Sequence, residues 1–413
     1  MQPTEGHSSG KAAIAGHAKA GPKSVVGDDF TIGSRSPFHS KGPLHPAILL
    51  VLLLLTVLPG CATRPGPEVL VPQATAPGAR LVTVYVATTR QRERPDMNVF
   101  TVGRAPALNY AEFTISIPPG HQAGRIEWPR GGSDPATSFT TVRQTILDRR
   151  TFERRIASQG RSQARAGVFV HGFNQNFQEA LFRLAQLAAD TDIDGVPILF
   201  AWPSEARVTG YTADKDAVTY SRDGLAELLS TLAQRRRTGE LALIAHSMGG
   251  WLAVEALRQL RLTGRNAALD RLDVILAAPD IDVDVFRAQM AVIGPLRRPM
   301  TILVSPDDRA LSASSRIAGD RPRIGALNVT DPRIQEAATR TNVRFVDIST
   351  VPASDRFNHD RFVHIAALYP ELASTAPGGA GRNLQRAGAF IFDSVGRTLQ
   401  SPFDFAGRAL AGE

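Results

Sequence analysis

A serine that could act as a nucleophile follows the apolar run LALIA at residues 241–245. The local sequence AHSMGG places Ser247 between a predicted strand and an amphipathic helix. A tight strand-to-helix turn needs small residues two positions before and after the serine, because the two backbones pass close together there. Ala245 and Gly249 occupy those positions. The turn would lift the hydroxyl clear of the sheet, so we expect Ser247 to attack a carbonyl carbon.

Negative charge that develops on the attacked oxygen would need two backbone amides. The first amides of the new helix point toward the serine, so Met248 would supply one of them. The run VFVHGFN at residues 168–174 offers the second, from Phe173, since Gly172 lets the backbone approach closely. His171 lies in the same run, but serine hydrolases with such a turn place the histidine last in the chain, after the acid. His171 is therefore not the expected base.

Only two histidines follow Ser247 in the chain, His359 and His364. His359 lies in the polar stretch SDRFNHD, after the apolar run VRFVDI, where a loop could present it to the serine. His364 falls within the apolar helix predicted next, where packing or capping is its expected role. We favour His359 as the general base that takes the serine proton and then protonates the leaving group.

A carboxylate is needed to fix the tautomer of that imidazole, and two loops offer one. The run MTILVS is followed by Asp307 and Asp308, and two adjacent acids cannot both point at one ring. One strand earlier, the sequence AAPDID supplies Asp280 and Asp282, which could instead cap the next helix. The later loop is favoured, and these residues alone do not decide between Asp307 and Asp308.

The elements that must position these groups alternate regularly over residues 151–370. Short apolar runs, typical of strands buried on both faces, are separated by helix-length segments: GVFVH, PILFAW, LALIAH, LDVILA, MTILVS and VRFVDI. This pattern predicts an α/β fold with a doubly wound, mostly parallel sheet. Ahead of it, residues 81–150 contain the alternating runs LVTVYVAT and AEFTISI, which predict a β-rich N-terminal extension.

An export signal is expected at the N-terminus. The uncharged run PAILLVLLLLTVL ends at residue 58 and is shorter than the ~20 residues that a membrane-spanning helix needs. The next residues complete LPGC, which resembles the lipobox of bacterial lipoproteins. We therefore expect residues 1–60 to be removed and Cys61 to carry diacylglycerol. Residues 61–80 would then form a flexible spacer between the lipid and the folded domain. We expect the lipid to hold the protein in the cell envelope, facing the periplasm, at the outer membrane in preference to the inner.

The composition of the chain limits the classes of partner and cofactor that we expect. The 413 residues carry a formal charge of +8, but the arginines are scattered, so we expect no nucleic-acid partner. The lone cysteine allows no internal disulfide, and the histidines fall in unrelated loops, so neither a metal nor an organic cofactor is expected. Residues 371–413 form a Gly-rich tail with a possible amphipathic helix that packs on the domain or lies along the bilayer. No feature of the sequence indicates the oligomeric state.

Taken together, the motifs resemble a bacterial family of α/β hydrolases long catalogued as a domain of unknown function. The resemblance covers residues 81–370 and rests on VYVATTR, SIPPGH, VFVHGFN, FAWPS, AHSMGG, AAPDID, SPDDRAL and NHDRF. It implies an α/β-hydrolase fold with Ser247 as nucleophile, Asp308 rather than Asp307 as acid, and His359 as base. This chain departs from the nucleophile pattern at Ala245, where glycine is usual, and in its doubled aspartate.

The expected reaction is hydrolysis of a carboxylic ester-type bond, in a small molecule or a lipid, through an acyl-enzyme on Ser247. Amidase or peptidase activity is an alternative, as is a non-catalytic envelope lipoprotein that uses the fold for binding. Four residues could wall the acyl pocket, although core packing is the more ordinary role for each: Trp202, Pro203, Tyr211 and Tyr220.

Overall fold

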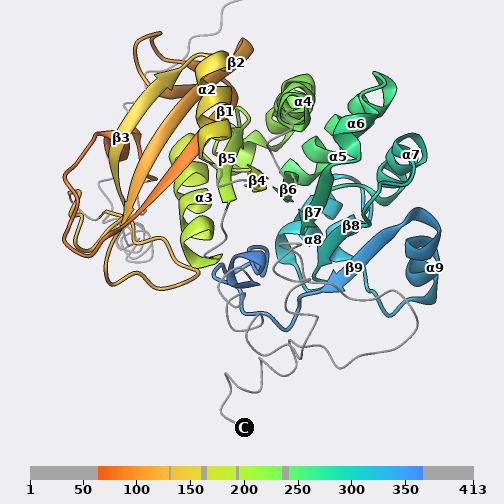
Figure 1. Cartoon of the computed structure of the whole chain (residues 1–413). Coiled ribbons are helices and arrows are strands. Elements are labelled where there is room, and N and C mark those ends of the chain that lie inside the picture. Colours follow the sequence, from red (N-terminus) through yellow and green to blue (C-terminus); the bar gives the residue numbers. More distant parts are fainter. Residues whose placement is uncertain (1–63, 130–131, 160–164, 192–194, 235–240, 366–413) are drawn as a thin grey trace, which may run out of the picture. The chain divides into compact units, whose positions relative to one another are not determined.

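The computed structural model describes residues 64–129, 132–159, 165–191, 195–234 and 241–365 (Figure 1). Residues Met1–Thr63 form a unit separate from Arg64–Glu413, and all that follows concerns the second unit. The expected export segment, Cys61 and the C-terminal tail lie outside the described residues. Among the residues that are described, no helix is both long and apolar enough to span a membrane.

The described strands form one nine-stranded sheet in the order β3-β2-β1-β5-β4-β6-β7-β8-β9. Strand β1 pairs parallel with β5, and β4 to β9 run parallel to their neighbours, whereas β2 pairs antiparallel with both β1 and β3. The strands are β1 (Arg80–Arg92), β2 (Phe100–Ile117), β3 (Thr140–Leu147), β4 (Arg165–Val170), β5 (Gly195–Ala201), β6 (Leu241–His246), β7 (Leu272–Ala277), β8 (Met300–Val304) and β9 (Val343–Asp347).

The six apolar runs predicted to be buried strands coincide with β4 to β9, which confirms the doubly wound, mostly parallel sheet. The β-rich extension is confirmed as well, but it is not a separate layer. Strand β1 pairs with β5 from residues 85–88 and 198–201, so the extension continues the same sheet (Figure 1).

Helices cover both faces of this sheet, as its buried strands require. They are η1 (Pro67–Leu70), α2 (Arg149–Ser158), α3 (Phe177–Thr191), η2 (Val208–Gly210), α4 (Tyr211–Ala233), α5 (Met248–Leu262), α6 (Asn266–Leu269), α7 (Val283–Ile293), α8 (Arg309–Ile317), η3 (Ile324–Ala326) and α9 (Pro332–Thr341). Alternate residues of each strand enter different cores: Leu243 packs in the core that includes α4 and α5, and Ile244 packs against the core that includes α3.

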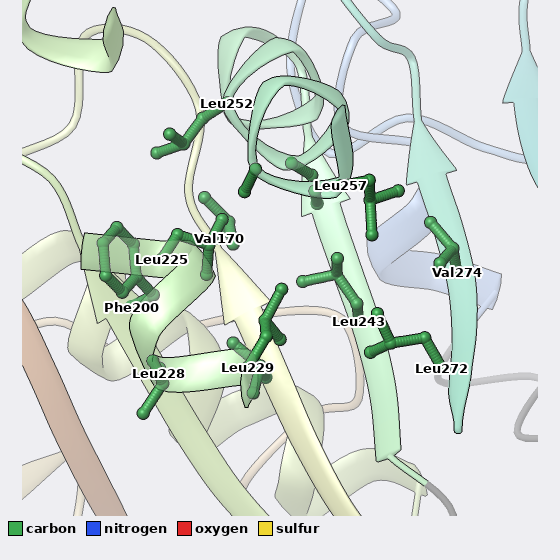
Figure 2. Close-up of a cluster of buried hydrophobic side chains, with 14 of the residues drawn as sticks. Val170, Phe200, Leu225, Leu228, Leu229, Leu243, Leu252, Leu257, Leu272 and Val274 are labelled. Atoms are coloured by element: carbon green, nitrogen blue, oxygen red, sulfur yellow. The ribbon is translucent and has the colours of Figure 1, made fainter. Parts of the chain in front are cut away.

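The core beneath α4 and α5 is built from aliphatic side chains that meet across the two layers. Each fully buried leucine or valine contributes about 1.5–3 kcal/mol relative to exposure. This packing fixes where α5 begins relative to the strand ends. Figure 2 shows the strand side chains against those of the two helices: Val170, Phe200, Leu243, Leu272 and Val274 against Leu225, Leu228, Leu229, Leu252 and Leu257.

The polypeptide just before β1 is packed against the domain. Val69 and Leu70 of η1 are buried in the core that also contains α3. Thr141 Oγ1 donates to the Val69 carbonyl oxygen (2.9 Å), and Gln144 Nε2 donates to that of Leu70 (3.1 Å). The expectation of a flexible spacer over residues 61–80 is therefore wrong for residues 64–70, which are bound to the domain.

Helix α5 begins so close to the end of β4 that only glycine fits at its second position. A Cβ atom on Gly249 would lie 2.3 Å from the His171 carbonyl oxygen and 2.7 Å from that of Val170. Both atoms belong to the backbone, so neither can move aside without shifting the strand. The close approach of α5 to β4 thus depends on the missing side chain.

We predict that Gly249→Ala lowers the free energy of unfolding by about 1–3 kcal/mol, the usual cost of overpacking a core. Urea unfolding would measure this change. Gly167→Ala, on β4 itself, is the matched control, because a Cβ there meets no atom within 4 Å. Equal stability of the two variants would contradict the close approach.

Candidate active site

Ser247 stands between β6 and α5 with an unusual backbone conformation, φ 54° and ψ −123°. Its amide donates to the Ala277 carbonyl oxygen (2.9 Å), while its own carbonyl accepts from the amides of Gly250 (2.9 Å) and Asp280 (3.1 Å). The predicted strand-turn-helix is present. Ser247 is only 5% exposed, so it is enclosed by neighbouring loops more than the sequence predicts.

The loop after β4 lies directly against this turn. A Cβ atom on Gly172 would stand 3.0 Å from Ser247 Cβ and 2.8 Å from His246 Nδ1. The next residue is Phe173, and Met248 is the first residue of α5. The two segments predicted to supply oxyanion-binding amides are therefore adjacent to the serine.

Strained backbone positions gather at this edge of the sheet. Four non-glycine residues with positive φ follow consecutive strands β4 to β7: Asn174 (60°), Ala206 (55°), Ser247 (54°) and Ala278 (45°). Each such position costs on the order of 1–3 kcal/mol, and such strain concentrates at functional sites. A functional site is therefore expected at the carboxyl ends of these strands.

Asp308 and His359 are in direct contact, although they lie 51 residues apart in the chain. His359 Nδ1 is 2.6 Å from Asp308 Oδ2. The other oxygen of Asp308 accepts from the Leu311 amide (2.9 Å) and so caps α8, and the whole side chain is buried. The His359 amide donates to Asp355 Oδ1 (2.9 Å). The acid and the imidazole are therefore both held from more than one direction.

The neighbouring Asp307 has a different set of partners. It accepts from Ser305 Oγ (2.6 Å), from Asn358 Nδ2 (2.9 Å) and from Arg361 Nη2 (2.6 Å). Two of these donors flank His359 in sequence. Asp307 thus fixes the loop that carries the imidazole, whereas Asp308 contacts the imidazole itself.

The other two candidate acids, Asp280 and Asp282, have partners other than His359. Asp280 accepts from Ser314 Oγ (2.6 Å) and Tyr211 Oη (3.0 Å), and it pairs with Arg323 at 3.2 Å. Asp282 caps α7 by accepting from the amides of residues 284 and 285. Of the four aspartates considered, Asp308 is the one that contacts His359.

The electrostatics of His359 follow from burial and from its partner. Burial lowers the pKa of the imidazole, but the hydrogen bond and negative charge of Asp308 raise it more, with help from the charges of Asp280 and Asp355. The net pKa of His359 lies above its usual 6.5. A hydrogen bond from Nδ1–H to Asp308 leaves Nε2 as the atom able to accept a proton.

His246, the residue just before the serine, was not singled out from the sequence. Its Nε2 lies 3.2 Å from the His359 carbonyl oxygen, and the two rings are 4.6 Å apart. Burial holds the pKa of His246 well below its usual value, so the ring is neutral and Nε2–H donates. The residue before Ser247 thus contacts the loop that carries His359. The sequence feature that could have identified His246 is its position next to Ser247.

Two further histidines do not contact Asp308. His171 is buried and stacks on Trp202 with ring centroids 4.9 Å apart, and burial, together with the charge of Arg90, lowers its pKa to about 3. His364 packs its ring against Gly124. These positions agree with the preference for His359 over both.

The suggested pocket residues have different environments. Trp202 is fully buried and donates from Nε1 to the His171 carbonyl oxygen (2.7 Å), so it belongs to the core, and Pro203 is also buried. Tyr220 is 40% exposed and donates to the Ala105 carbonyl oxygen. Tyr211 packs edge-on against Phe173 with ring centroids 5.4 Å apart, which places it beside the β4 loop.

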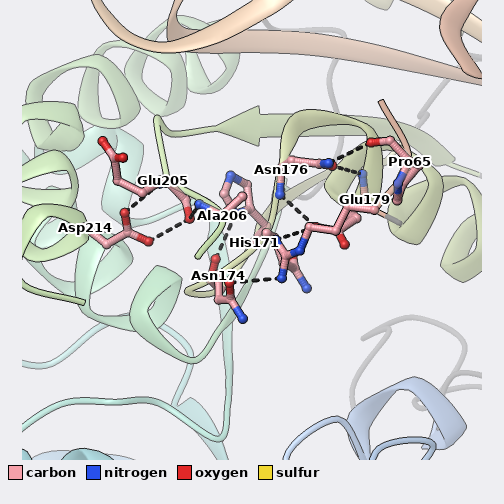
Figure 3. Close-up of polar contacts among 12 residues, drawn as sticks. Pro65, His171, Asn174, Asn176, Glu179, Glu205, Ala206 and Asp214 are labelled. Carbon is pink, nitrogen blue, oxygen red and sulfur yellow. Dashed lines mark hydrogen bonds and ion pairs between the residues drawn. The ribbon is translucent and has the colours of Figure 1, made fainter. Parts of the chain in front are cut away.

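Two buried residues that sequence reasoning did not find, Asp214 and Arg90, hold the β4 loop. Figure 3 labels Asp214 and Asn174. Asp214 accepts from Ser204 Oγ (2.6 Å) and from the Asn174 amide. Arg90 donates to the carbonyl oxygens of Gln175 (3.1 Å) and Ser204 (3.2 Å), and burial lowers its pKa to about 10. Arg90 is the last residue of the motif VYVATTR, so this motif is the sequence feature that could have identified it.

No group of three or more histidine, cysteine, aspartate or glutamate side chains in the described part of the chain is arranged to hold a metal ion.

The sheet, the strained serine turn and the acid-imidazole contact define the class of an α/β hydrolase. The chain belongs to the family described as "Alpha/beta hydrolase of unknown function (DUF900)", whose model matches residues 148–375. An uncharacterised protein of Nostoc sp. (strain PCC 7120) is 36% identical over 61 residues, which is 15% of this chain and 16% of that protein.

Solved structures with some likeness have low identity and low TM-scores. Est1E from Butyrivibrio proteoclasticus is 10% identical over 52% of this chain and 90% of that chain, with a TM-score of 0.32. A hyperthermophilic esterase from the archaeon Pyrobaculum calidifontis is 10% identical over 80% of this chain and 99% of that chain, with a TM-score of 0.33.

We predict that Asp308→Asn reduces kcat by about 10³- to 10⁴-fold, as when the orienting acid of a triad is replaced by its amide. A base must be neutral, so activity falls as pH drops through the raised pKa of His359. Without Asp308, burial lowers that pKa, and the acid limb of the pH profile moves to lower pH. Steady-state rates across pH would measure both effects.

Asp307→Asn is the matched control, since it changes the adjacent carboxylate without touching the imidazole. It should leave the acid limb in place and reduce kcat far less. An acid limb that does not move in Asp308→Asn would contradict the assignment of Asp308.

Proposed function

We propose that the protein is a serine hydrolase that cleaves a carboxylic ester-type bond through an acyl-enzyme. His359 Nε2 takes the proton of Ser247 as its oxygen attacks the carbonyl carbon, and the imidazole then gives that proton to the leaving alcohol. Water, deprotonated by the same nitrogen, attacks the acyl-enzyme and releases the acid. The observation that carries this proposal is the 2.6 Å contact between His359 Nδ1 and Asp308, beside the strained Ser247 turn.

In this mechanism the amides of Phe173 and Met248 bind the oxyanion. The tight packing of Gly172 against Ser247 supports this assignment, because it brings the two segments close enough to share one oxygen. Removal of a single donor of this kind typically costs about 10²- to 10³-fold in kcat.

The proposal includes a lipid anchor. An apolar run of signal-peptide length, followed by LPGC, supports export and attachment of diacylglycerol to the Cys61 thiol. The hydrolase would then remain in the bacterial cell envelope and face the periplasm, at the outer membrane in preference to the inner.

We predict that a fluorophosphonate probe labels the purified chain and that Ser247→Ala abolishes labelling without changing the thermal unfolding temperature. The probe reacts only with a serine whose hydroxyl is activated by a base. Ser158→Ala, on the exposed end of α2, is the matched control and should label normally. A well-folded protein that never labels would contradict the enzymatic proposal and favour a binding role.

A chromogenic ester panel beside an amide panel would then separate an esterase from an amidase or peptidase. We expect turnover of the esters.

A further inference from the structure

The chain enters the folded unit at the loop that borders the active site. Arg64 Nη2 donates to Asn174 Oδ1 (2.9 Å), and Arg64 Nη1 lies 3.3 Å from Glu179 Oε2. The carbonyl oxygen of Pro65 accepts from Asn176 Nδ2 (2.8 Å). Figure 3 shows Pro65 beside Asn176 and Glu179. The first two described residues are thus bound to the segment between β4 and α3 and to the first turn of α3.

This attachment continues into the domain. Burial of Val69 and Leu70 and their backbone hydrogen bonds to β3 fix the following residues. A tether from Cys61 therefore has three residues before the first fixed contact, and three residues span at most about 11 Å. A flexible spacer over 61–80 would instead have an r.m.s. length of about 25 Å.

The same loop reaches the nucleophile. Asn174, which binds Arg64, comes directly after Phe173, and Gly172 packs against Ser247. The loop after β4 therefore contacts both Arg64, where the chain enters the folded unit, and Ser247, the proposed nucleophile. Arg90, which donates to the Gln175 carbonyl oxygen, and Asp214, which accepts from the Asn174 amide, also hold this loop.

We infer that the substrate is an acyl ester embedded in the same bilayer as the anchor. This inference rests on the proposed function, namely a serine esterase with a lipid on Cys61. A tether of three residues keeps the loop of the active site close to the membrane surface, where a lipid ester has a high effective concentration. A substrate dissolved in water gains nothing from this arrangement.

The test lengthens the tether. A Gly-Ser insertion of about twelve residues between Thr63 and Arg64 would give an r.m.s. slack of about 19 Å and leave every described residue unchanged. The full chain and the insertion variant are expressed with their lipid anchor and reconstituted in phosphatidylethanolamine and phosphatidylglycerol vesicles. Two rates are measured, on a fluorogenic diacylglycerol in the same vesicles and on soluble p-nitrophenyl butyrate.

The insertion should reduce the rate on the embedded ester about fivefold or more, through lost effective concentration, and leave the soluble rate unchanged. An unchanged embedded rate, or a full chain that cleaves only the soluble ester, would overturn the inference. Absence of fluorophosphonate labelling and of both rates in the full chain would instead mark failure of the proposed function.

A second measurement needs no variant and covers the case in which the insertion disturbs folding and lowers both rates. The full chain in one vesicle population is mixed with a second population that carries the diacylglycerol. Hydrolysis should be confined to substrate in the enzyme's own vesicles. Equal rates on the two populations would refute a bilayer-restricted substrate.

Discussion

The backbone of Ser247, at φ 54° and ψ −123°, lies in a region that L-residues avoid, and holding it there costs about 1–3 kcal/mol. Hydrogen bonds to Ala277, Gly250 and Asp280 offset that cost, each worth roughly 1 kcal/mol. They exist only because β6 and β7 are paired and α5 starts immediately after β6. Gly249 permits that start by lacking a side chain where β4 ends. The parallel sheet therefore creates the strained turn that the rest of the site surrounds.

Two adjacent carboxylates divide the support of His359 between them. Asp308 fixes the orientation and raises the pKa of the ring, whereas Asp307 anchors the surrounding loop through Asn358 and Arg361. His246 adds a neutral contact from the serine side. Since a triad needs its reacting atoms held within a fraction of an ångström, the proposed role of His359 as a base carried on a loop requires supports of this kind. The doubled aspartate thus has a physical role at both positions.

The described segment before β1 is bound to the domain, which its composition does not predict. Sequence composition between Cys61 and β1 is rich in proline, alanine and glycine, which is typical of a linker. In the structure, contacts of Arg64 with Asn174 and burial of Leu70 order much of that segment. Composition describes what a chain does in isolation, but a few apolar side chains suffice to bind it to a surface that already exists.

The sequence by itself determined the strands, the serine turn and the order of the proposed catalytic groups, because these depend on patterns within about ten residues and on a fixed topology. Resemblance to a family also pointed to Asp308. Only the tertiary structure decided which carboxylate touches His359, the contact of His246 with that loop, and the fixed path of the segment before β1. These depend on contacts across 51 or more residues, and on the register of strands and helix starts to within an ångström. Local sequence patterns do not encode such distances.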